Sequence, residues 1–168
     1  MQAMTYSPIP LRLETERLVL SPRDAADAEW YAELLNARGA GIFTIEDALQ
    51  RIADTTKTFE DTGIGALAIR KRPDGEALGY VAIVVGRSSL EEPEIAYELL
   101  PRAHGQGYAT EAARALLDAA FATGRHRIWA TIGSWNAPSL RVAEKLGFRR
   151  DRLTTEANGE VIWMVCDR

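Results

Sequence analysis

The sequence predicts a mixed α/β (α+β) fold, a central sheet with helices on its faces, and two observations predict it. Strand-like runs alternate with amphipathic helical runs along the chain. In addition, a strand-like run over 95–100 leads through a glycine-containing loop into a helix, and a further strand follows over 127–132. Such a strand–helix–strand unit makes its two strands parallel, whereas the short turns elsewhere favour antiparallel pairs.

Length and composition suit one domain over 1–168 with a sizeable core. The chain has 168 residues, of which 46% are hydrophobic and 26% charged. Its net charge of −4 argues against nucleic-acid binding by bulk electrostatics. A single cysteine, Cys166, with only His104 and His126 besides, gives no basis for a disulfide framework or a metal centre. No apolar run is long enough for a membrane helix and no signal peptide is recognisable, so we expect a cytoplasmic protein without a membrane partner.

The first half should contain one strand and two helices after an extended lead-in over 1–13. A short strand over 17–21 ends at Pro22, and Asp24 is placed to cap a helix over about 25–36. Thr44, with Asp47 three residues on, predicts a capping box and the start of a second helix that ends at Gly63. The first helix should bury Ala26, Trp30, Tyr31, Leu34 and Leu35. The second should bury Ile45, Leu49, Ile52, Thr56 and Phe59.

The second half should supply the rest of the sheet and two more helices. Strands over 66–70 and 78–85 flank the turn Pro73-Asp74-Gly75 and form an antiparallel pair. A helix that begins near Ala109 carries apolar residues at helical spacing as far as Phe121, and Gly124 ends it. Another helix follows over 136–146. The chain then closes with a hairpin over 148–153 and 161–165 around Asn158-Gly159.

The loop around Gly105 and Gly107 is the most informative stretch, because a glycine loop that opens into a helix can bind an anion. A nucleotide-binding P-loop would need Gly-Lys-Ser/Thr, but Tyr108 and Ala109 follow Gly107. A dinucleotide site fits poorly too, since Thr110 takes the third small-residue position and no carboxylate lies near Arg127. A tight strand-to-helix turn without a ligand is the structural alternative.

The residues around this loop resemble a known family. The pattern Arg102-x-x-Gly105-x-Gly107-x-Ala109 resembles the pyrophosphate motif of the GNAT acetyltransferase superfamily. The run over 94–112 resembles its RimJ/RimL-type ribosomal-protein N-acetyltransferases, and so do 13–20 and the block Asn136-x-x-Ser139 through Phe148. The resemblance implies the GNAT fold: a mixed, mostly antiparallel sheet of about seven strands, helices on both faces and a splayed parallel strand pair at the cofactor site.

The resemblance also implies where acetyl-CoA binds. Backbone N–H groups of the glycine loop would hold the pyrophosphate, and the backbone of Tyr97, Glu98 and Leu99 would pair with the pantetheine arm. Asn136 matches a family asparagine at the cofactor, although helix capping explains it equally well. The implied cofactor-binding residues are Tyr97, Leu99, Arg102, His104, Gly105, Gln106, Gly107, Tyr108, Ala109, Thr110, Asn136 and Ser139.

Catalysis in the family is direct transfer of acetyl to an amine, which needs an acid and a base. Ala143 stands where many members have a tyrosine acid, and the resemblance then assigns the proton donor to Ser139. Helix capping is the alternative role for this serine. Glu156 is the nearest match for a base that works through water, and Glu98 is the other candidate. For both glutamates a solvated surface carboxylate is the alternative.

The function implied is an acetyl-CoA-dependent N-acetyltransferase without a metal. Its acceptor would be a primary amine, on a protein N-terminus or on a small amine, amino acid or antibiotic. A non-catalytic acyl-CoA-binding or regulatory module is the rival interpretation, since Ala143 replaces the usual tyrosine and the strand over 128–132 carries no glutamate. Homodimers are common in the family, so a second copy of the chain is one partner to consider.

Overall fold

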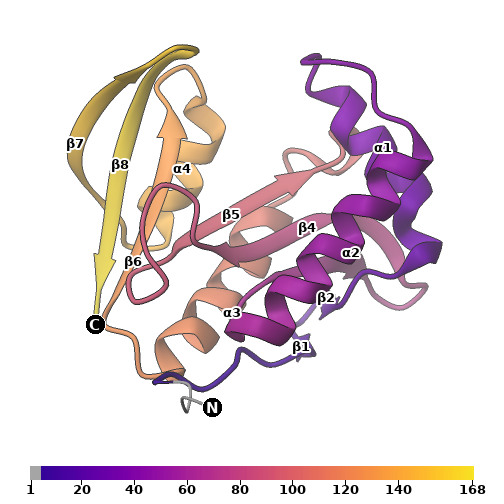
Figure 1. Ribbon diagram of the computed structural model, residues 1–168, viewed down its shortest axis with the longest axis horizontal. Helices are drawn as coiled ribbons and strands as arrows, with labels where there is room; N and C mark the ends of the chain where they lie inside the picture. Colours follow the sequence, from indigo (N-terminus) through magenta and orange to yellow (C-terminus); the bar gives the residue numbers. More distant parts are fainter. Residues whose placement is uncertain (1–4) are drawn as a thin grey trace.

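The computed structural model describes residues 5–168 and shows one mixed sheet with helices on both faces (Figure 1). The strand order is β1-β2-β3-β4-β5-β6-β8-β7, and only β5 and β6 are parallel neighbours. The strands are β1 (Leu13–Glu14), β2 (Leu18–Ser21), β3 (Ala66–Lys71), β4 (Glu76–Val84), β5 (Glu94–Leu99), β6 (Arg127–Gly133), β7 (Arg149–Glu156) and β8 (Gly159–Asp167). The helices are α1 (Ala28–Ala37), α2 (Ile45–Thr62), α3 (Tyr108–Ala122) and α4 (Ala137–Lys145), with short 3₁₀ turns at Ala25–Asp27 and Pro101–Ala103.

The predicted fold class and element order are confirmed, with one strand more than expected. The additional strand is β1, in which Leu13 pairs with Leu20 and Glu14 with Val19. It lies at the end of the stretch expected as an extended lead-in, of which residues 1–4 fall outside the described part. A two-residue strand has too little periodicity to be recognised in a sequence, so only the pairing reveals it.

The two faces of the sheet have different cores. Side chains of a strand alternate between faces, and on β4 Tyr80 packs with α1 and α2 whereas Val81 and Ile83 pack in the larger core. That larger core includes Leu116 and Leu117 of α3 and Leu140 of α4. In Figure 1, α1 and α2 lie in front of the sheet, and α3 and α4 lie behind it.

The second helix begins as predicted, whereas α1 begins at Ala28 and not near Ala25, and the buried faces of both differ from the expected ones. Asp24 caps the 3₁₀ turn that precedes α1, and Thr44 with Asp47 forms the capping box of α2. Ala26 is exposed because it belongs to the 3₁₀ turn rather than to the helix. Ile45 and Leu49 are 50% and 37% exposed, whereas Ala48 and Ile52 are buried. Ala48 and Ile52 are the buried residues of α2, and they pack in one cluster with residues of α1.

The parallel strands β5 and β6 separate almost at once. Their pairing is recorded at a single register position, Glu94 opposite Trp129. Beyond it, β5 runs toward α1 and β6 runs toward the β7–β8 hairpin (Figure 1). One edge of β5 is therefore open from Ile95 to Leu99, which confirms the expected splay.

None of the described helices combines the length and the apolar character that crossing a membrane requires.

Candidate active site

The loop between β5 and α3 presents a row of unpaired backbone donors. Gly105 and Gly107 have φ angles of 75° and 80°, a conformation that other residues adopt only with strain. Within the described residues, the backbone N–H groups of residues 105–110 have no acceptor in the protein. The last three of them begin α3, where the helix dipole adds positive charge. Six consecutive free donors of this kind can bind an anion.

The side chains of this loop mostly point away from the donors. Arg102 lies 3.3 Å from a carboxylate oxygen of Glu33 and 3.4 Å from one of Glu76. The Nε2 atom of His104 lies 2.9 Å from the backbone oxygen of Leu99, and Tyr108 is buried. The donors that this loop offers are therefore backbone N–H groups, and the guanidinium of Arg102 faces α1 and β4 instead.

An ion pair that the sequence analysis did not anticipate braces the loop against the β1–β2 turn. Arg17 donates from Nε to Glu111 over 2.7 Å and from Nη1 to the backbone oxygen of Gln106 over 2.9 Å. Its guanidinium also lies 4.4 Å from the centre of the Tyr108 ring. Arg17 and Glu111 are 94 residues apart, so no local pattern could have paired them.

Glu111 is ionised in this environment. Burial by itself would raise its pKa, but hydrogen bonds from the Thr15 hydroxyl, at 2.6 Å, and from Arg17 outweigh burial and lower the pKa. The Glu111 carboxylate accepts hydrogen bonds from Thr15 and Arg17, and the Arg17 guanidinium balances its charge, so Glu111 does not repel an anion at the loop.

A second surface for an anion lies beside the first turns of α3. An open cavity of about 590 Å³ is lined by Thr15, Gly107, Thr110, Glu111, Arg114, Ala115, Asp118 and Lys145. Both of its acids are neutralised, Glu111 by Arg17 and Asp118 by Arg168 at 2.7 Å. Arg114 donates only to the backbone oxygen of Lys145, and Lys145 has no acidic partner among the described residues. The cavity is therefore net positive.

On the α4 side of the splay, β5 and the start of α4 are joined by one hydrogen bond. The Tyr97 hydroxyl donates to the backbone oxygen of Ser139 over 2.6 Å, and burial raises the pKa of Tyr97. Asn136 caps α4 by accepting from the Ser139 N–H at 3.3 Å. The side-chain hydroxyl of the half-buried Ser139 forms no hydrogen bond within residues 5–168. It is a donor at the edge of the opening.

On the α1 side, Glu98 is held by Arg38 from the end of α1. The Nε atom of Arg38 lies 2.8 Å from one carboxylate oxygen of Glu98, and its Nη2 atom donates to the other. Nη2 also lies 3.2 Å from the Tyr80 hydroxyl, whose pKa burial raises to about 12. This bidentate pair neutralises Glu98 and fixes its direction.

Glu156, the other candidate base, belongs to a second network on that face. The Nε atom of Arg87 lies 2.9 Å and 3.0 Å from the two oxygens of Glu156, and its Nη1 atom donates to the Thr131 hydroxyl over 2.8 Å. Glu156 is 39% exposed and is bound by one guanidinium nitrogen only. It is the more accessible of the two candidate carboxylates.

Glu94, which sequence reasoning treated only as a strand residue, connects this network to the sheet. It is 4% exposed, and its two oxygens accept from the Thr131 hydroxyl and from the backbone N–H of Arg87. A Cβ on Gly86 would lie 2.1 Å from a Glu94 oxygen, so the close contact requires a glycine there. Gly86 was the one sign of this contact in the sequence, and it can be interpreted only when its contact with Glu94 is known.

The structure thus places the candidates on two sides of one opening. Tyr97 and Ser139 lie on the α3 and α4 side of the sheet, whereas Glu98 and Glu156 lie on the side of α1 and α2. The glycine loop stands at the far end of β5. An extended ligand with an anionic end can lie along the open edge of β5. Its other end would then have a hydroxyl donor, Ser139, on one side and two carboxylates, Glu98 and Glu156, on the other side.

Comparison with known proteins agrees with this geometry. The family model described as Acetyltransferase (GNAT) domain matches residues 17–149. A probable N-acetyltransferase of Bacillus subtilis, YjcK, is 27% identical over 90% of this chain and 91% of its own.

Solved structures give the same result. A putative GNAT-family acetyltransferase from Bordetella pertussis is 28% identical, covers 93% of this chain and 99% of its own, and has a TM-score of 0.81. A putative ribosomal-protein-serine acetyltransferase from Vibrio cholerae has a TM-score of 0.79 and covers 96% of this chain and 99% of its own. Because its identity is 21%, this likeness concerns the fold. With the family model matched over most of its length, the chain belongs to the GNAT acetyltransferase family and is an N-acetyltransferase.

Proposed function

We propose that this protein transfers acetyl from acetyl-CoA to a primary amine, with the CoA pyrophosphate on the 105–110 loop. The row of six unpaired backbone donors carries the proposal. A diphosphate presents several anionic oxygens at once, and a glycine loop at a helix N-terminus can meet them without side chains in between.

The positive cavity beside α3 fits the remaining phosphate of CoA. It adjoins Gly107 and Thr110. Its two cations, Arg114 and Lys145, lack acidic partners within the described part of the chain, while both of its acids have basic ones. We assign the 3′-phosphate to these two side chains. The positive charges of Arg114 and Lys145 would then favour binding of CoA over binding of acyl carriers that have only the pantetheine phosphate and no 3′-phosphate.

The open edge of β5 fits the pantetheine arm. Its amides can pair with backbone groups between Ile95 and Leu99, as a further strand would. The thioester at the end of the arm would then lie between Ser139 on one side and Glu98 and Glu156 on the other. Asn136 supports this region by capping α4.

We assign the acid to Ser139 and the base to Glu156. Bound acetyl-CoA supplies the acetyl thioester, and the protein must remove a proton from the incoming ammonium and supply one to the departing sulfur. The Ser139 hydroxyl is free of other hydrogen bonds within the described residues and can donate. Glu156 can accept a proton through a water molecule, since it is partly exposed and loosely paired. Glu98, clamped by Arg38, would orient the acceptor.

Glu94 acts as a positioning residue in this scheme. It fixes the Thr131 hydroxyl and the backbone of Arg87, and those two residues set where the Arg87 guanidinium meets Glu156. A charged acceptor amine is consistent with the partly exposed carboxylate of Glu156 on this face. We place the acceptor among protein N-termini, as in the RimJ/RimL-type branch, with small amines second. The name of the Vibrio cholerae neighbour gives a ribosomal protein as the substrate of that protein.

The assay is release of free thiol from acetyl-CoA against N-terminal peptides and small amines. We expect turnover on at least one class of primary amine. Tight CoA binding with no turnover on any amine would instead support the non-catalytic module.

The assignment of the acid has its own test. Ser139→Ala should lower kcat by about 10²-fold while the Kd of CoA changes little, because the hydroxyl is needed only when the sulfur leaves. The Ser139 backbone oxygen that binds Tyr97 remains in this variant. Equal losses in kcat and in CoA affinity would make Ser139 a cofactor contact alone.

A further inference from the structure

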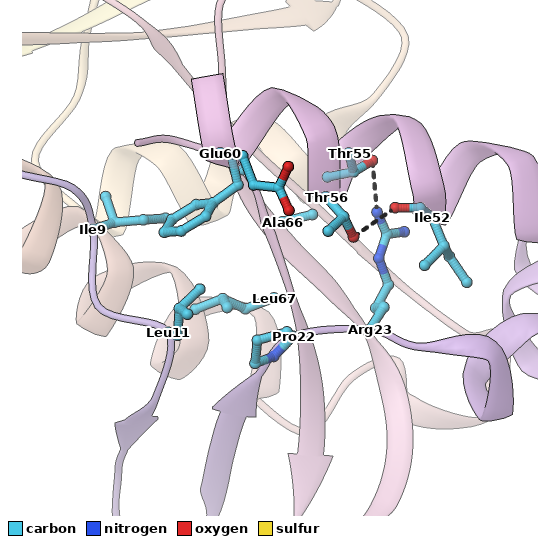
Figure 2. Close-up of a pocket in the computed structure, with 12 residues that line it drawn as sticks. Ile9, Leu11, Pro22, Arg23, Ile52, Thr55, Thr56, Glu60, Ala66 and Leu67 are labelled. Atoms are coloured by element: carbon cyan, nitrogen blue, oxygen red, sulfur yellow. Dashed lines mark hydrogen bonds between the residues drawn. The ribbon is translucent and has the colours of Figure 1, made fainter. Parts of the chain in front are cut away.

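A buried arginine without a counter-ion closes one end of a cavity that the transfer reaction does not use. The cavity measures about 260 Å³ and lies under α2, against the start of β3 and the chain that follows β2 (Figure 2). It is lined by Ile9, Leu11, Pro22, Arg23, Ile52, Thr55, Thr56, Phe59, Glu60, Gly65, Ala66 and Leu67. Apart from Arg23, two threonines and Glu60, this lining is apolar or glycine.

The guanidinium of Arg23 is incompletely satisfied. Arg23 is 7% exposed, and its Nη2 atom donates to the Thr55 hydroxyl over 3.2 Å. Its Nη1 atom is buried and has no hydrogen-bond partner within residues 5–168. No carboxylate among residues 5–168 lies within ion-pair distance of it, whereas the half-buried Arg70 is paired with the buried Asp27 at 2.8 Å. Burying a guanidinium without an anion is unfavourable, because the charge loses its hydration.

The aromatic rings beside Arg23 compensate only part of that loss. The guanidinium carbon lies 4.3 Å from the centre of the Tyr31 ring and 5.4 Å from that of Tyr80. These contacts provide no hydrogen-bond acceptor for the Nη1 atom, which stays available for a ligand. The edge fits a carboxylate, which accepts two parallel N–H bonds from an arginine.

The size and the walls of the cavity define the rest of the ligand. Since an engineered cavity of about 150 Å³ holds benzene, this larger space accepts a small ring or a short alkyl chain together with a carboxylate. Ile9, Phe59 and Leu67 supply apolar contacts for it. The acid of the lining, Glu60, is exposed, belongs to the last turns of α2 and does not lie within ion-pair distance of Arg23.

We propose that this cavity is a binding site for a small monocarboxylate, which places its carboxylate on Arg23 and its aliphatic or aromatic body among Ile9, Phe59 and Leu67. The site is separate from the glycine loop and does not depend on the acetyl-transfer reaction. Tyr80 joins the two regions, since its ring faces Arg23 and its hydroxyl accepts from Arg38 of the Arg38–Glu98 pair.

The test uses matched acid and amide probes on the full chain. Phenylacetate and hexanoate are titrated by calorimetry, each beside its amide, with CoA at saturation so that the cofactor site is blocked. We expect each acid to bind at least about tenfold tighter than its amide, the difference that a charge-assisted hydrogen bond supplies. Equal affinities for acid and amide would overturn the proposal, as would the absence of saturable binding by either acid up to about 10 mM.

Variants then locate the site. Arg23→Met should remove the preference for acid over amide, and Glu60→Gln should tighten acid binding by at most about threefold because its charge is exposed. Since Arg23→Met could fail to fold, Thr56→Trp at the exposed rim provides an independent variant that fills the cavity and leaves Arg23 in place. It should abolish binding of both probes while the circular dichroism stays that of the parent. Unchanged acid binding in a folded Thr56→Trp protein would contradict the proposal.

Discussion

The two ends of the proposed acetyl-CoA site use different chemical groups: one end uses the backbone and the other uses side chains. At the pyrophosphate end, the binding groups are backbone N–H groups of six consecutive residues, and most of the loop's side chains turn away. At the acetyl end, the groups are side chains from distant segments: Glu98 meets Arg38 across 60 residues, and Glu156 meets Arg87 across 69. The cofactor anchor is therefore local in the sequence, and the chemical end exists only in the folded chain.

The largest effect should come from breaking the chemical end while the anchor stays intact. Glu156→Gln should lower kcat about 10²- to 10³-fold, the range of a lost general base, with little change in the KM of acetyl-CoA. Steady-state kinetics with each substrate varied in turn measures both.

Glu98→Gln is the matched control, because it removes a carboxylate from the same face and frees Arg38 as the first variant frees Arg87. It should raise the KM of the acceptor more than it lowers kcat. If Glu98→Gln reduces kcat more than Glu156→Gln does, the roles of the two glutamates are reversed.

The next effect should come from breaking the anchor while the chemical end stays intact. Gly107→Val places a branched side chain at a φ of 80°, where L-residues are strained, and directs its Cβ toward Arg17. We expect the Kd of CoA to rise about 10- to 100-fold, measured by calorimetry.

The kcat at saturating acetyl-CoA should fall far less, since Ser139 and Glu156 are untouched. A large fall in kcat with unchanged CoA affinity would show that the loop does not hold the cofactor.

The brace behind the anchor predicts a pH-dependent stability. Glu111→Gln should lower the free energy of unfolding by about 1.5–3 kcal/mol at pH 7, the worth of hydrogen bonds to a charged group. The pKa of Glu111 is lowered in the folded protein, so its contribution is complete above the unfolded value of 4.5 and is lost as the pH falls through the folded value.

Urea unfolding of both proteins between pH 7 and pH 3 measures this difference. The two stabilities should converge at the acid end of the range. A constant difference at all these pH values would mean that Glu111 acts by packing and not by its charge.

The smallest effect separates two cations near the anchor. Lys145→Met should weaken CoA about three- to tenfold but leave dephospho-CoA unaffected, because only CoA carries the 3′-phosphate. Arg102→Met is the control: its guanidinium faces Glu33 and Glu76, so we expect less than about a twofold change with either ligand. A selective loss of CoA in Arg102→Met would show that this side chain turns toward the cofactor when it binds.

The contrast between the two ends explains which expectations from the sequence succeeded. Thr44 with Asp47 and Asp24 specified helix starts, because capping depends on residues within one turn. The buried face of α2 was wrong at Ile45, Leu49 and Thr56, which are exposed, and Ala48 is buried instead, because the partner α1 and not the periodicity selects the face. Strand β1 escaped detection for the same reason, since its pairing with β2 and not its composition creates it.

The sequence by itself determined the order of the elements, the helical connection between the two parallel strands and the position of the glycine loop. Each of these depends on residues that are close together in the sequence and on their backbone preferences. Only the tertiary structure decided that Arg17 meets Glu111, that Glu94 fits against Gly86, that Arg102 turns away from the loop and that Arg23 is buried without an acid. These facts depend on which distant side chains the sheet brings within a few ångströms. The path of the whole chain decides which partner a side chain has, and the residue type alone does not identify that partner.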